Sequence, residues 1–126
     1  MGEWTPETGV LGDATAGPSD RIDVIALPGP MHVEFRTDEL TSVCPVTAQR
    51  DFYEVTIAFD AERWSIESKS LKLYLATFVD EGIFAEHLAH RIAGHLAPHV
   101  EVEVTVTLHQ NVRGGLVESV TATGLP

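Results

Sequence analysis

In the segment VEVEVTVTL at residues 100–108, every second residue is aliphatic. Successive side chains of a β-strand point to opposite faces, so this alternation predicts a strand with one buried and one solvated face. Residues 111–115 (NVRGG) predict a turn, and residues 116–123 are predicted to return as the next strand. The end of the chain is therefore expected to form an antiparallel hairpin.

Two segments before this strand have helical periodicity. Apolar residues three or four positions apart are Leu71, Tyr74, Leu75 and Phe78 in the first segment, and Phe84, Leu88, Ile92 and Leu96 in the second. Ser68 or Ser70 is expected to cap the first helix. Residues 81–82 (EG) separate the two helices, and Pro98 is expected to end the second.

Two further strands are predicted at residues 32–36 and 53–59, where apolar and polar residues alternate. The residues between them, 41–51, have no period and predict a loop. The order strand, strand, helix, helix, strand, strand predicts an α+β sandwich, in which an antiparallel sheet carries both helices on one face.

Composition limits the class of protein. The chain has 126 residues with 8 Lys and Arg against 19 Asp and Glu, a net charge of −11, which argues against direct binding of nucleic acid. This length allows one core, so we expect a single domain at residues 23–126 after a flexible tail at residues 1–22, which is rich in Gly and Pro. No apolar run reaches the ~18 residues of a membrane helix, and residues 1–3 lack the basic start of a signal peptide. We therefore expect a cytoplasmic protein.

One thiol and one carboxylate border the predicted loop. Cys44 is the single cysteine, which excludes an internal disulfide and leaves the roles of buried filler or nucleophile. Asp51 ends the same loop, and a nearby carboxyl can hold or deliver the proton that thiol chemistry needs. A buried Cys44 with a solvated Asp51 is the alternative that the spacing leaves open.

The segment ESKSLKLY at residues 67–74 carries two of the eight basic residues. Lys69 and Lys72 share a face near the start of the first predicted helix, an arrangement that suits the phosphate of a dinucleotide. An amphipathic helix with solvated lysines is the alternative.

Four histidines, His87, His90, His95 and His99, follow Glu86. At about 100° per residue they spread over roughly half of the helix circumference, so no metal site is expected. A carboxylate such as Glu86 can instead accept two hydrogen bonds from the edge of a guanine-like base.

Five motifs together resemble the NADPH-dependent 7-cyano-7-deazaguanine (preQ0) reductases of the short, single-domain type. They are TSVCP at residues 41–45, DF at 51–52, ESKSLKLY at 67–74, FAE at 84–86 and RGG at 113–115. The octapeptide matches the signature of that family and is the most specific of the five. The resemblance implies the tunnelling (T) fold, whose element order agrees with the order predicted above.

The resemblance implies reduction of a nitrile to an amine with two NADPH, in the pathway to the tRNA base queuosine. Cys44 would attack the nitrile carbon to give a thioimide, and Asp51 would donate a proton to the nitrogen. Substrate binding is implied for Ile66, Glu67, Ser68, Ala85 and Glu86, and contact with the NADPH phosphates for Lys69, Lys72 and Arg113. Family members assemble from several subunits with sites at the interfaces, so a homo-oligomer is expected.

Ala85 departs from the family pattern, which has a histidine immediately before the glutamate that reads the base. His87 is no simple substitute, because positions 85 and 87 point about 200° apart on a helix. His90 lies about one turn from Glu86 on the same face and is the better candidate for compensation.

Three other functions are open. In a related amidinotransferase, an amine donor would attack the same thioimide, but those relatives lack the octapeptide. A purine-binding module would keep Glu86 and have no turnover. A zinc-dependent pterin-forming enzyme of the same fold would need a better ligand set than one cysteine and these histidines.

Overall fold

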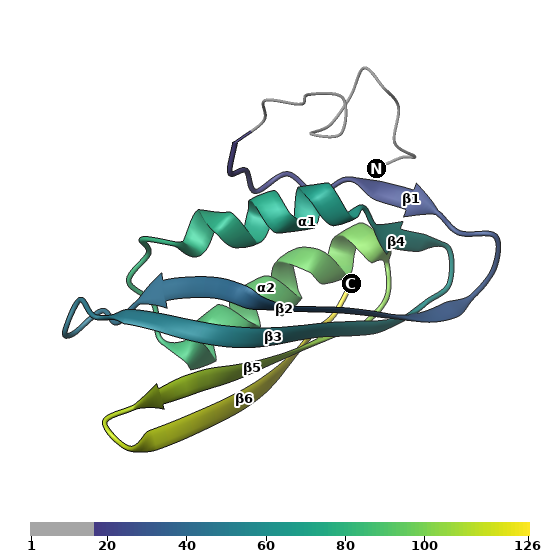
Figure 1. Cartoon of the computed structure of the whole chain (residues 1–126). Helices are drawn as coiled ribbons and strands as arrows, with labels where there is room; N and C mark the ends of the chain where they lie inside the picture. The colour runs from purple at the N-terminus through teal and green to yellow at the C-terminus, as the bar shows by residue number, and fades with distance from the viewer. Residues whose placement is uncertain (1–16) are drawn as a thin grey trace.

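A computed structural model of the chain describes residues 17–126. Its elements are β1 (Val24–Ala26), β2 (Met31–Val43), β3 (Arg50–Ala61), β4 (Trp64–Ile66), α1 (Ser68–Leu75), the 3-10 turn η2 (Ala76–Phe78), α2 (Ala85–Val100), β5 (Val104–Arg113) and β6 (Leu116–Gly124). Four strands form an antiparallel sheet in the order β2-β3-β5-β6. Both helices cover one face of this sheet (Figure 1). The predicted α+β arrangement is confirmed.

The strands of the first hairpin are longer than predicted. β2 and β3 pair as far as Val43 and Arg50, so the predicted loop at residues 41–51 shrinks to residues 44–49. Ser42 and Asp51 are opposite each other in the β2–β3 ladder, and both are buried. Backbone pairing between the two strands makes these residues part of a sheet, although their sequence shows no alternation of apolar and polar residues. β1 and β4, which pair with each other, were not predicted, because three residues are too few to show a period.

The N-cap of α1 is Glu67, and the prediction of Ser68 or Ser70 was wrong. The carboxylate of Glu67 accepts hydrogen bonds from the backbone nitrogens of Lys69 at 2.9 Å and Ser70 at 2.8 Å. The Ser70 hydroxyl is buried instead, where it accepts from the backbone nitrogen of Asp23 at 3.1 Å and donates to the carbonyl of Glu67 at 2.8 Å.

The second helix continues past Pro98, contrary to the prediction, and ends at Val100. A proline crowds the carbonyl four residues earlier, which here belongs to the exposed Gly94. Glu101 then takes the left-handed conformation (φ 63°) that closes the helix. The strand predicted from residue 100 therefore begins at Val104, and Val100 is buried as the last helical residue.

The core lies between the helices and the sheet. Leu88, Ile92 and Leu96 of α2 are fully buried, in one cluster with aliphatic residues of β3 and β5. Strand β6 approaches α2 so closely that a Cβ on Gly124 would lie 2.1 Å from the carbonyl oxygen of Ala93. Helix α2 therefore packs against the side of the sheet that is formed by β5 and β6.

Residues just before the predicted domain start at residue 23 contact the rest of the chain. The backbone nitrogen of Ser19 donates to the carbonyl of Leu73 at 3.2 Å, and Ile22 belongs to the core. Residues 1–16 of the tail predicted at 1–22 lie outside the described residues. Among the helices of residues 17–126, none is long and apolar enough to cross a membrane.

Candidate active site

Cys44 lies immediately after β2, where backbone hydrogen bonds fix the connection to β3. Its backbone nitrogen donates to the carbonyl of Gln49 at 2.8 Å, and its own carbonyl accepts from the backbone nitrogen of Ala48 at 2.9 Å. Ala48 has a positive φ of 60°, which lets the chain turn back within six residues. The turn holds Cys44 in a buried position, with 8% of its surface exposed.

The segment before α2 is attached to this same strand end. The backbone nitrogen of Val43 donates to the carbonyl of Glu81 at 2.9 Å, and that of Ile83 donates to the carbonyl of Val43 at 3.0 Å. These bonds form a short parallel bridge, and they place the first turn of α2 beside Cys44. Ala85 and Glu86 lie in that first turn.

Arg50 reinforces the connection from the other strand. Its guanidinium pairs with the carboxylate of Asp80 at 2.9 Å and donates to the carbonyl of Val79. Arg91 of α2 pairs with Glu81 in the same segment. No local pattern in the sequence indicates these two arginines, which connect the segment between η2 and α2 to β3 and to α2.

Asp51 is buried on β3, with 5% of its surface exposed. Its Oδ1 accepts a hydrogen bond from Nε2 of Gln110 on the neighbouring strand β5 at 3.1 Å. The sequence spacing was also compatible with an exposed Asp51. In the structure the side chain is buried, and a hydrogen bond from Gln110 orients its carboxyl group.

These residues surround one cavity of about 260 Å³. It is lined by Cys44, Asp51, Phe84, Ala85, Glu86, Gln110, Leu116 and Glu118. The structure thus brings together four of the residues singled out from the sequence, from the β2–β3 connection, β3 and α2. A thiol and a carboxyl in one small cavity provide a nucleophile and a proton donor or acceptor within the same enclosure.

Gln110 and Glu118 were missed in the sequence, although a signal for them exists. Gln110 lies two residues after the buried Leu108, and Glu118 lies two residues before Val120, so each continues an apolar strand face with a polar side chain. The two residues face each other across β5 and β6. A polar residue at a core-facing position is a marker for a functional site.

The carboxyl of Glu118 has an altered acidity. Its pKa is raised, first by a hydrogen bond with Glu86, then by desolvation and by the negative charges of Glu86 and Asp51. The cavity therefore holds three carboxyl groups, and the negative charges of two of them act on Glu118.

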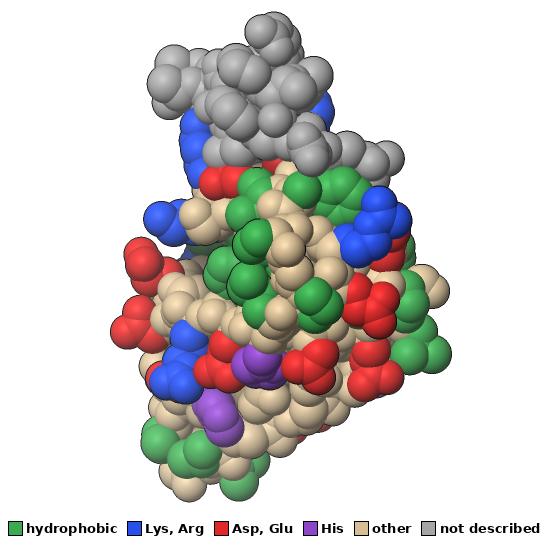
Figure 2. Space-filling view, turned by 90° about the vertical axis from the view of Figure 1, so that its right-hand side faces the viewer, with side chains coloured by type: hydrophobic (Ala, Val, Ile, Leu, Met, Phe, Trp, Pro, Cys, Tyr) green, Lys and Arg blue, Asp and Glu red, His purple; other side chains and the backbone are tan. Residues whose placement is uncertain are grey.

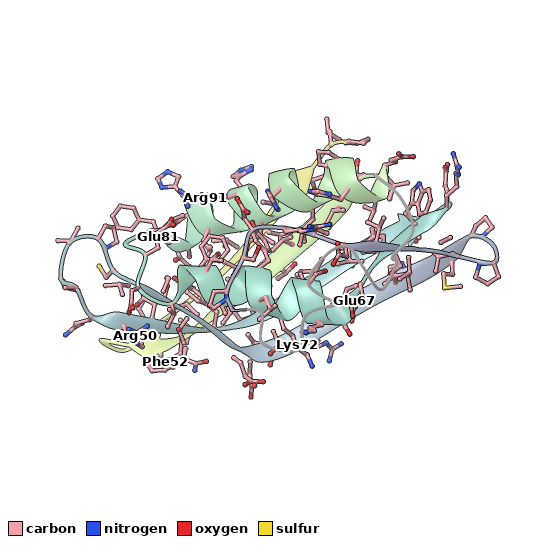
Figure 3. All side chains as sticks on the ribbon, turned by 90° about the horizontal axis from the view of Figure 1, so that it is seen from above. Arg50, Phe52, Glu67, Lys72, Glu81 and Arg91 are labelled. Carbon is pink, nitrogen blue, oxygen red and sulfur yellow. The ribbon has the colours of Figure 1, made fainter. Side chains whose placement is uncertain are left out.

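The residues Ile66, Glu67 and Ser68 lie elsewhere in the chain. They line a surface hollow with residues of β1 and β2, at the end of the molecule that carries β1 and β4. In the view from above, Arg50 and Glu81 mark the Cys44 end, and Glu67 lies well away from them (Figure 3). Figure 2 faces the β1–β4 end and shows apolar side chains gathered beside acidic ones. One chain does not bring these residues to Cys44.

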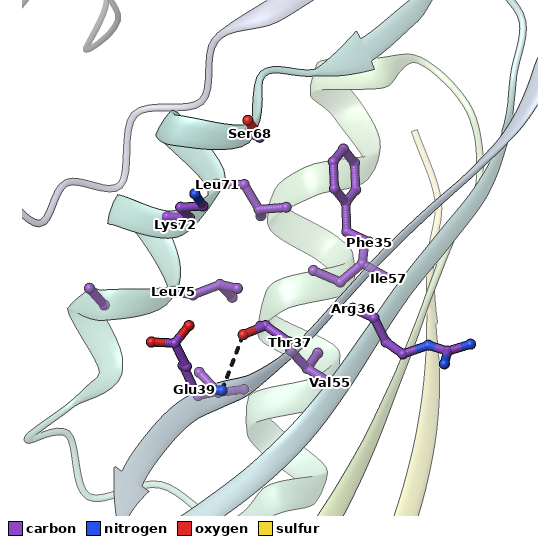
Figure 4. Close-up of a pocket in the computed structure, with 12 residues that line it drawn as sticks. Phe35, Arg36, Thr37, Glu39, Val55, Ile57, Ser68, Leu71, Lys72 and Leu75 are labelled. Atoms are coloured by element: carbon purple, nitrogen blue, oxygen red, sulfur yellow. Dashed lines mark hydrogen bonds between the residues drawn. The ribbon is translucent and has the colours of Figure 1, made fainter.

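Lys72 lies beside a second cavity, of about 440 Å³, between α1 and β2 (Figure 4). Its floor is apolar, with Leu71 and Leu75 from the helix, and Arg36 adds a second cation to its lining. Lys69, one turn earlier, is part-buried at the start of the same helix. The predicted contact of Lys69 and Lys72 with the NADPH phosphates stays a prediction.

Arg113 ends β5, and its backbone pairs with Leu116, which lines the Cys44 cavity. Only its backbone is described, so the predicted contact with NADPH stays a prediction. The turn after it uses Gly114 and Gly115, both with positive φ (62° and 79°), as a two-residue hairpin turn requires.

The histidines of α2 do not enter this cavity. His90 is exposed and is not among the residues that line it, so the suggestion that it replaces the missing histidine finds no support. His95 stacks on Tyr74 at 4.5 Å between ring centroids. Within residues 17–126, no three His, Cys, Asp or Glu side chains are grouped as metal ligands.

An antiparallel sheet with two helices on one face is the arrangement of the T-fold, and a buried cysteine and aspartate lie at one end of it. A solved structure with this fold, an archaeosine synthase QueF-Like in the apo form, covers 78% of the chain and 95% of its own, with a TM-score of 0.66 and 21% identity. This likeness concerns the fold alone.

Sequence comparison defines the family. The family model described as QueF-like protein matches residues 50–124, and the chain belongs to this family. A relative from Thermomicrobium roseum is 39% identical over 109 residues, which cover 83% of this chain and 85% of the relative. Another from Frankia casuarinae is 44% identical over 93 residues (71% and 74%), and one from Rhodopirellula baltica is 36% identical over 113 residues (86% and 93%). All three are named NADPH-dependent 7-cyano-7-deazaguanine reductase.

Proposed function

We propose that this protein reduces the nitrile of 7-cyano-7-deazaguanine to an aminomethyl group with NADPH, as the names of its relatives indicate for them, within queuosine biosynthesis. The observation that carries the proposal is the cavity in which the buried Cys44 and Asp51 lie beside Glu86. A nitrile is an electrophile with a linear, compact shape, which a small cavity lined by a thiol can accept.

Cys44 acts as the nucleophile. Its sulfur forms a bond to the nitrile carbon, one π bond of the nitrile breaks, and the nitrogen takes up a proton, which gives a thioimide. Asp51 supplies that proton and takes up the proton that the Cys44 thiol releases, and the hydrogen bond from Gln110 orients the Asp51 carboxyl. When bound, NADPH supplies the hydrides, one to the thioimide carbon and a second to the imine that remains after the sulfur departs. The full reaction converts one nitrile, two NADPH and two protons into one amine and two NADP⁺.

Glu86 reads the base. A carboxylate offers two acceptor oxygens, which match the ring N–H and the exocyclic amino group on one edge of 7-deazaguanine. Its position in the first turn of α2 sets it across the same cavity from Cys44, so the base and its nitrile can be held between them.

The complete site includes a second copy of the chain. Ile66, Glu67 and Ser68, which the family resemblance assigns to the substrate, lie at the opposite end of the molecule from Cys44, so they can reach a substrate only in a neighbouring subunit. Strands β2 and β6 are the edges of the four-stranded sheet, and their free backbone groups are available for pairing between subunits. Lys69 and Lys72 then hold the NADPH phosphates near that junction.

The proposal is tested by intact mass after incubation with preQ0 alone and then with NADPH. We expect wild type to gain the mass of one preQ0 and to lose it when NADPH is added. The Cys44→Ala variant should gain nothing. An adduct that persists with NADPH would favour a transferase or a binding protein without turnover, and adduct formation on Cys44→Ala would refute the nucleophile.

A further inference from the structure

Residues 79–84, between η2 and α2, determine where α2 begins. The N-cap residue of α2 is Phe84, whose side chain makes no capping hydrogen bond, so the helix start is not fixed by a polar cap. Its position depends instead on the segment that precedes it. Glu86, which lies in the first turn of α2 and lines the Cys44 cavity, depends on the same segment.

The second half of this segment is attached to the end of β2 by its backbone. Residues 81 and 83 form the two hydrogen bonds with Val43 described above. Gly82, between them, packs against the residue that follows Cys44, because a Cβ on Gly82 would lie 3.5 Å from the Cα of Pro45. Residues 81–83 are therefore in direct contact with the strand end that carries the thiol.

The first half of the segment is held by a side chain of β3. The Arg50 guanidinium pairs with the Asp80 carboxylate at 2.9 Å, donates to the carbonyl of Val79, and donates to Oγ1 of Thr41 on β2 at 3.3 Å. An ion pair between exposed side chains contributes little to stability by itself. One planar guanidinium with three partners, two of them successive residues of the segment, restricts the segment more than the ion pair alone.

A second arginine holds the segment from the side of the helix. Arg91 of α2 pairs with Glu81. In the view from above, Glu81 lies between Arg91 and Arg50 (Figure 3). The segment is thus connected to α2 by one arginine and to the β2–β3 hairpin by the other.

We propose that Arg50 is a positioning residue for substrate binding, which acts through residues 79–81 to keep Glu86 across the cavity from Cys44. The inference rests on the proposed function, because it takes Glu86 as the residue that reads the base. It assigns to an arginine outside the cavity lining a part of the affinity for the substrate.

The reacting groups have supports that do not involve the Arg50 guanidinium. Cys44 is held by the backbone hydrogen bonds of the β2–β3 connection, and Asp51 by the strand ladder and by Gln110. Loss of the guanidinium should therefore weaken the binding of preQ0 and leave the chemical step unchanged.

The test measures kcat and the KM for preQ0 with NADPH in excess. Arg50→Met removes the guanidinium and keeps an aliphatic stem, and Arg50→Lys keeps the charge but not the planar group with several donors. Glu86→Gln and the double variant of Arg50→Met with Glu86→Gln show whether Arg50 acts through Glu86. Asp60→Asn is the matched control, because Asp60 is an exposed aspartate that pairs with His32 near the opposite end of β3.

We expect Arg50→Met to raise the KM about tenfold and to leave kcat within about twofold, which is the pattern of lost substrate binding. Arg50→Lys should raise the KM less, and Asp60→Asn should change neither constant. The double variant should have the KM of Glu86→Gln alone. A merely structural defect would instead reduce the fraction of active protein, and hence kcat, at an unchanged KM.

Three results would overturn the inference. They are an unchanged KM in Arg50→Met, a loss confined to kcat, and increases in KM that multiply in the double variant. If Arg50→Met does not fold, Arg50→Lys decides, and an unchanged KM there overturns the inference. The reductase function would stand in each case, whereas wild-type protein that oxidises no NADPH with preQ0 would refute that function and the inference with it.

Discussion

Gln110 and Asp51 lie on neighbouring strands and are joined by a hydrogen bond of 3.1 Å from the amide nitrogen to the carboxylate. Both side chains line the cavity that contains Cys44. Because Asp51 is nearly inaccessible to water, this bond from Gln110 is a main constraint on the direction of its carboxyl group. We therefore expect Gln110 to be a positioning residue that acts through Asp51.

This relationship predicts how two variants combine. Gln110→Leu should lower kcat about tenfold with little change in the KM for preQ0, because a misdirected carboxyl delivers its proton less often. Asp51→Asn should lower kcat by roughly 10²-fold or more. The double variant should be no slower than Asp51→Asn alone, whereas losses that multiply would show that Gln110 acts independently of Asp51. The measurement is the initial rate of NADPH oxidation.

The capping function of Glu67 predicts a loss of stability that is separate from any role in binding. Glu67→Ala removes the acceptor for two backbone N–H groups at the start of α1, so the free energy of unfolding should fall by about 1 kcal/mol. Glu62→Ala, at an exposed turn position, is the control and should change it little. Chemical denaturation followed by circular dichroism measures both, and equal stability of the two variants would contradict the capping role.

Two glycines at the junction of α2 and β6 should respond in opposite directions. Gly124→Ala places a methyl group against the backbone of Ala93, so the free energy of unfolding should fall by about 1–3 kcal/mol. Gly94→Ala meets no atom within 4 Å on an exposed helix position, so it should raise that free energy by about 0.5–1 kcal/mol. A stable Gly124→Ala protein would mean that the helix and strand do not approach so closely.

The histidines His99 and His32 predict opposite dependences of stability on pH. Burial, with the neighbouring His95, lowers the pKa of His99 from its ordinary 6.5, so the unfolded chain binds the proton more readily. Its contribution to stability is therefore present above about pH 6.5 and is lost as the pH falls toward the folded pKa. The hydrogen bond with Asp60 raises the pKa of His32, whose contribution is present below pH 6.5 and is lost as the pH rises through the folded pKa.

Thermal unfolding between pH 5 and pH 8 measures the effect. We expect His99→Gln to reduce the fall in Tm below pH 6.5, and His32→Gln to make that fall steeper. Identical pH profiles for the two variants would contradict the assignment.

Helices and strands were predictable wherever the periodicity of apolar residues continued over several helical turns or several residues of a strand. The alternation in residues 100–108 indicated strand β5, but it also continued the apolar face of α2 through Val100, so the boundary was placed four residues early. Ser42 and Asp51 were assigned to a loop because their pairing depends on a partner strand, which a local pattern does not report.

The site was predictable only in part, for a related reason. Cys44, Asp51 and Glu86 were recognisable from their motifs, but nothing local in the sequence says that Val43 bonds to the segment before α2. Gln110 and Glu118 belong to the cavity because the β5–β6 hairpin brings them there in register. Their positions follow from long-range strand pairing, which spacing along the chain does not reveal.

The stoichiometry of the full reaction tests whether this protein is a nitrile reductase that depends on Cys44. Purified protein is given preQ0 and excess NADPH, and the loss of NADPH absorbance is compared with the amine formed, with Cys44→Ala as the blank. We expect two NADPH to be oxidised for each nitrile converted, and no oxidation in the blank. NADPH oxidation that continues in Cys44→Ala, or a covalent preQ0 adduct without any NADPH oxidation in wild type, would contradict it.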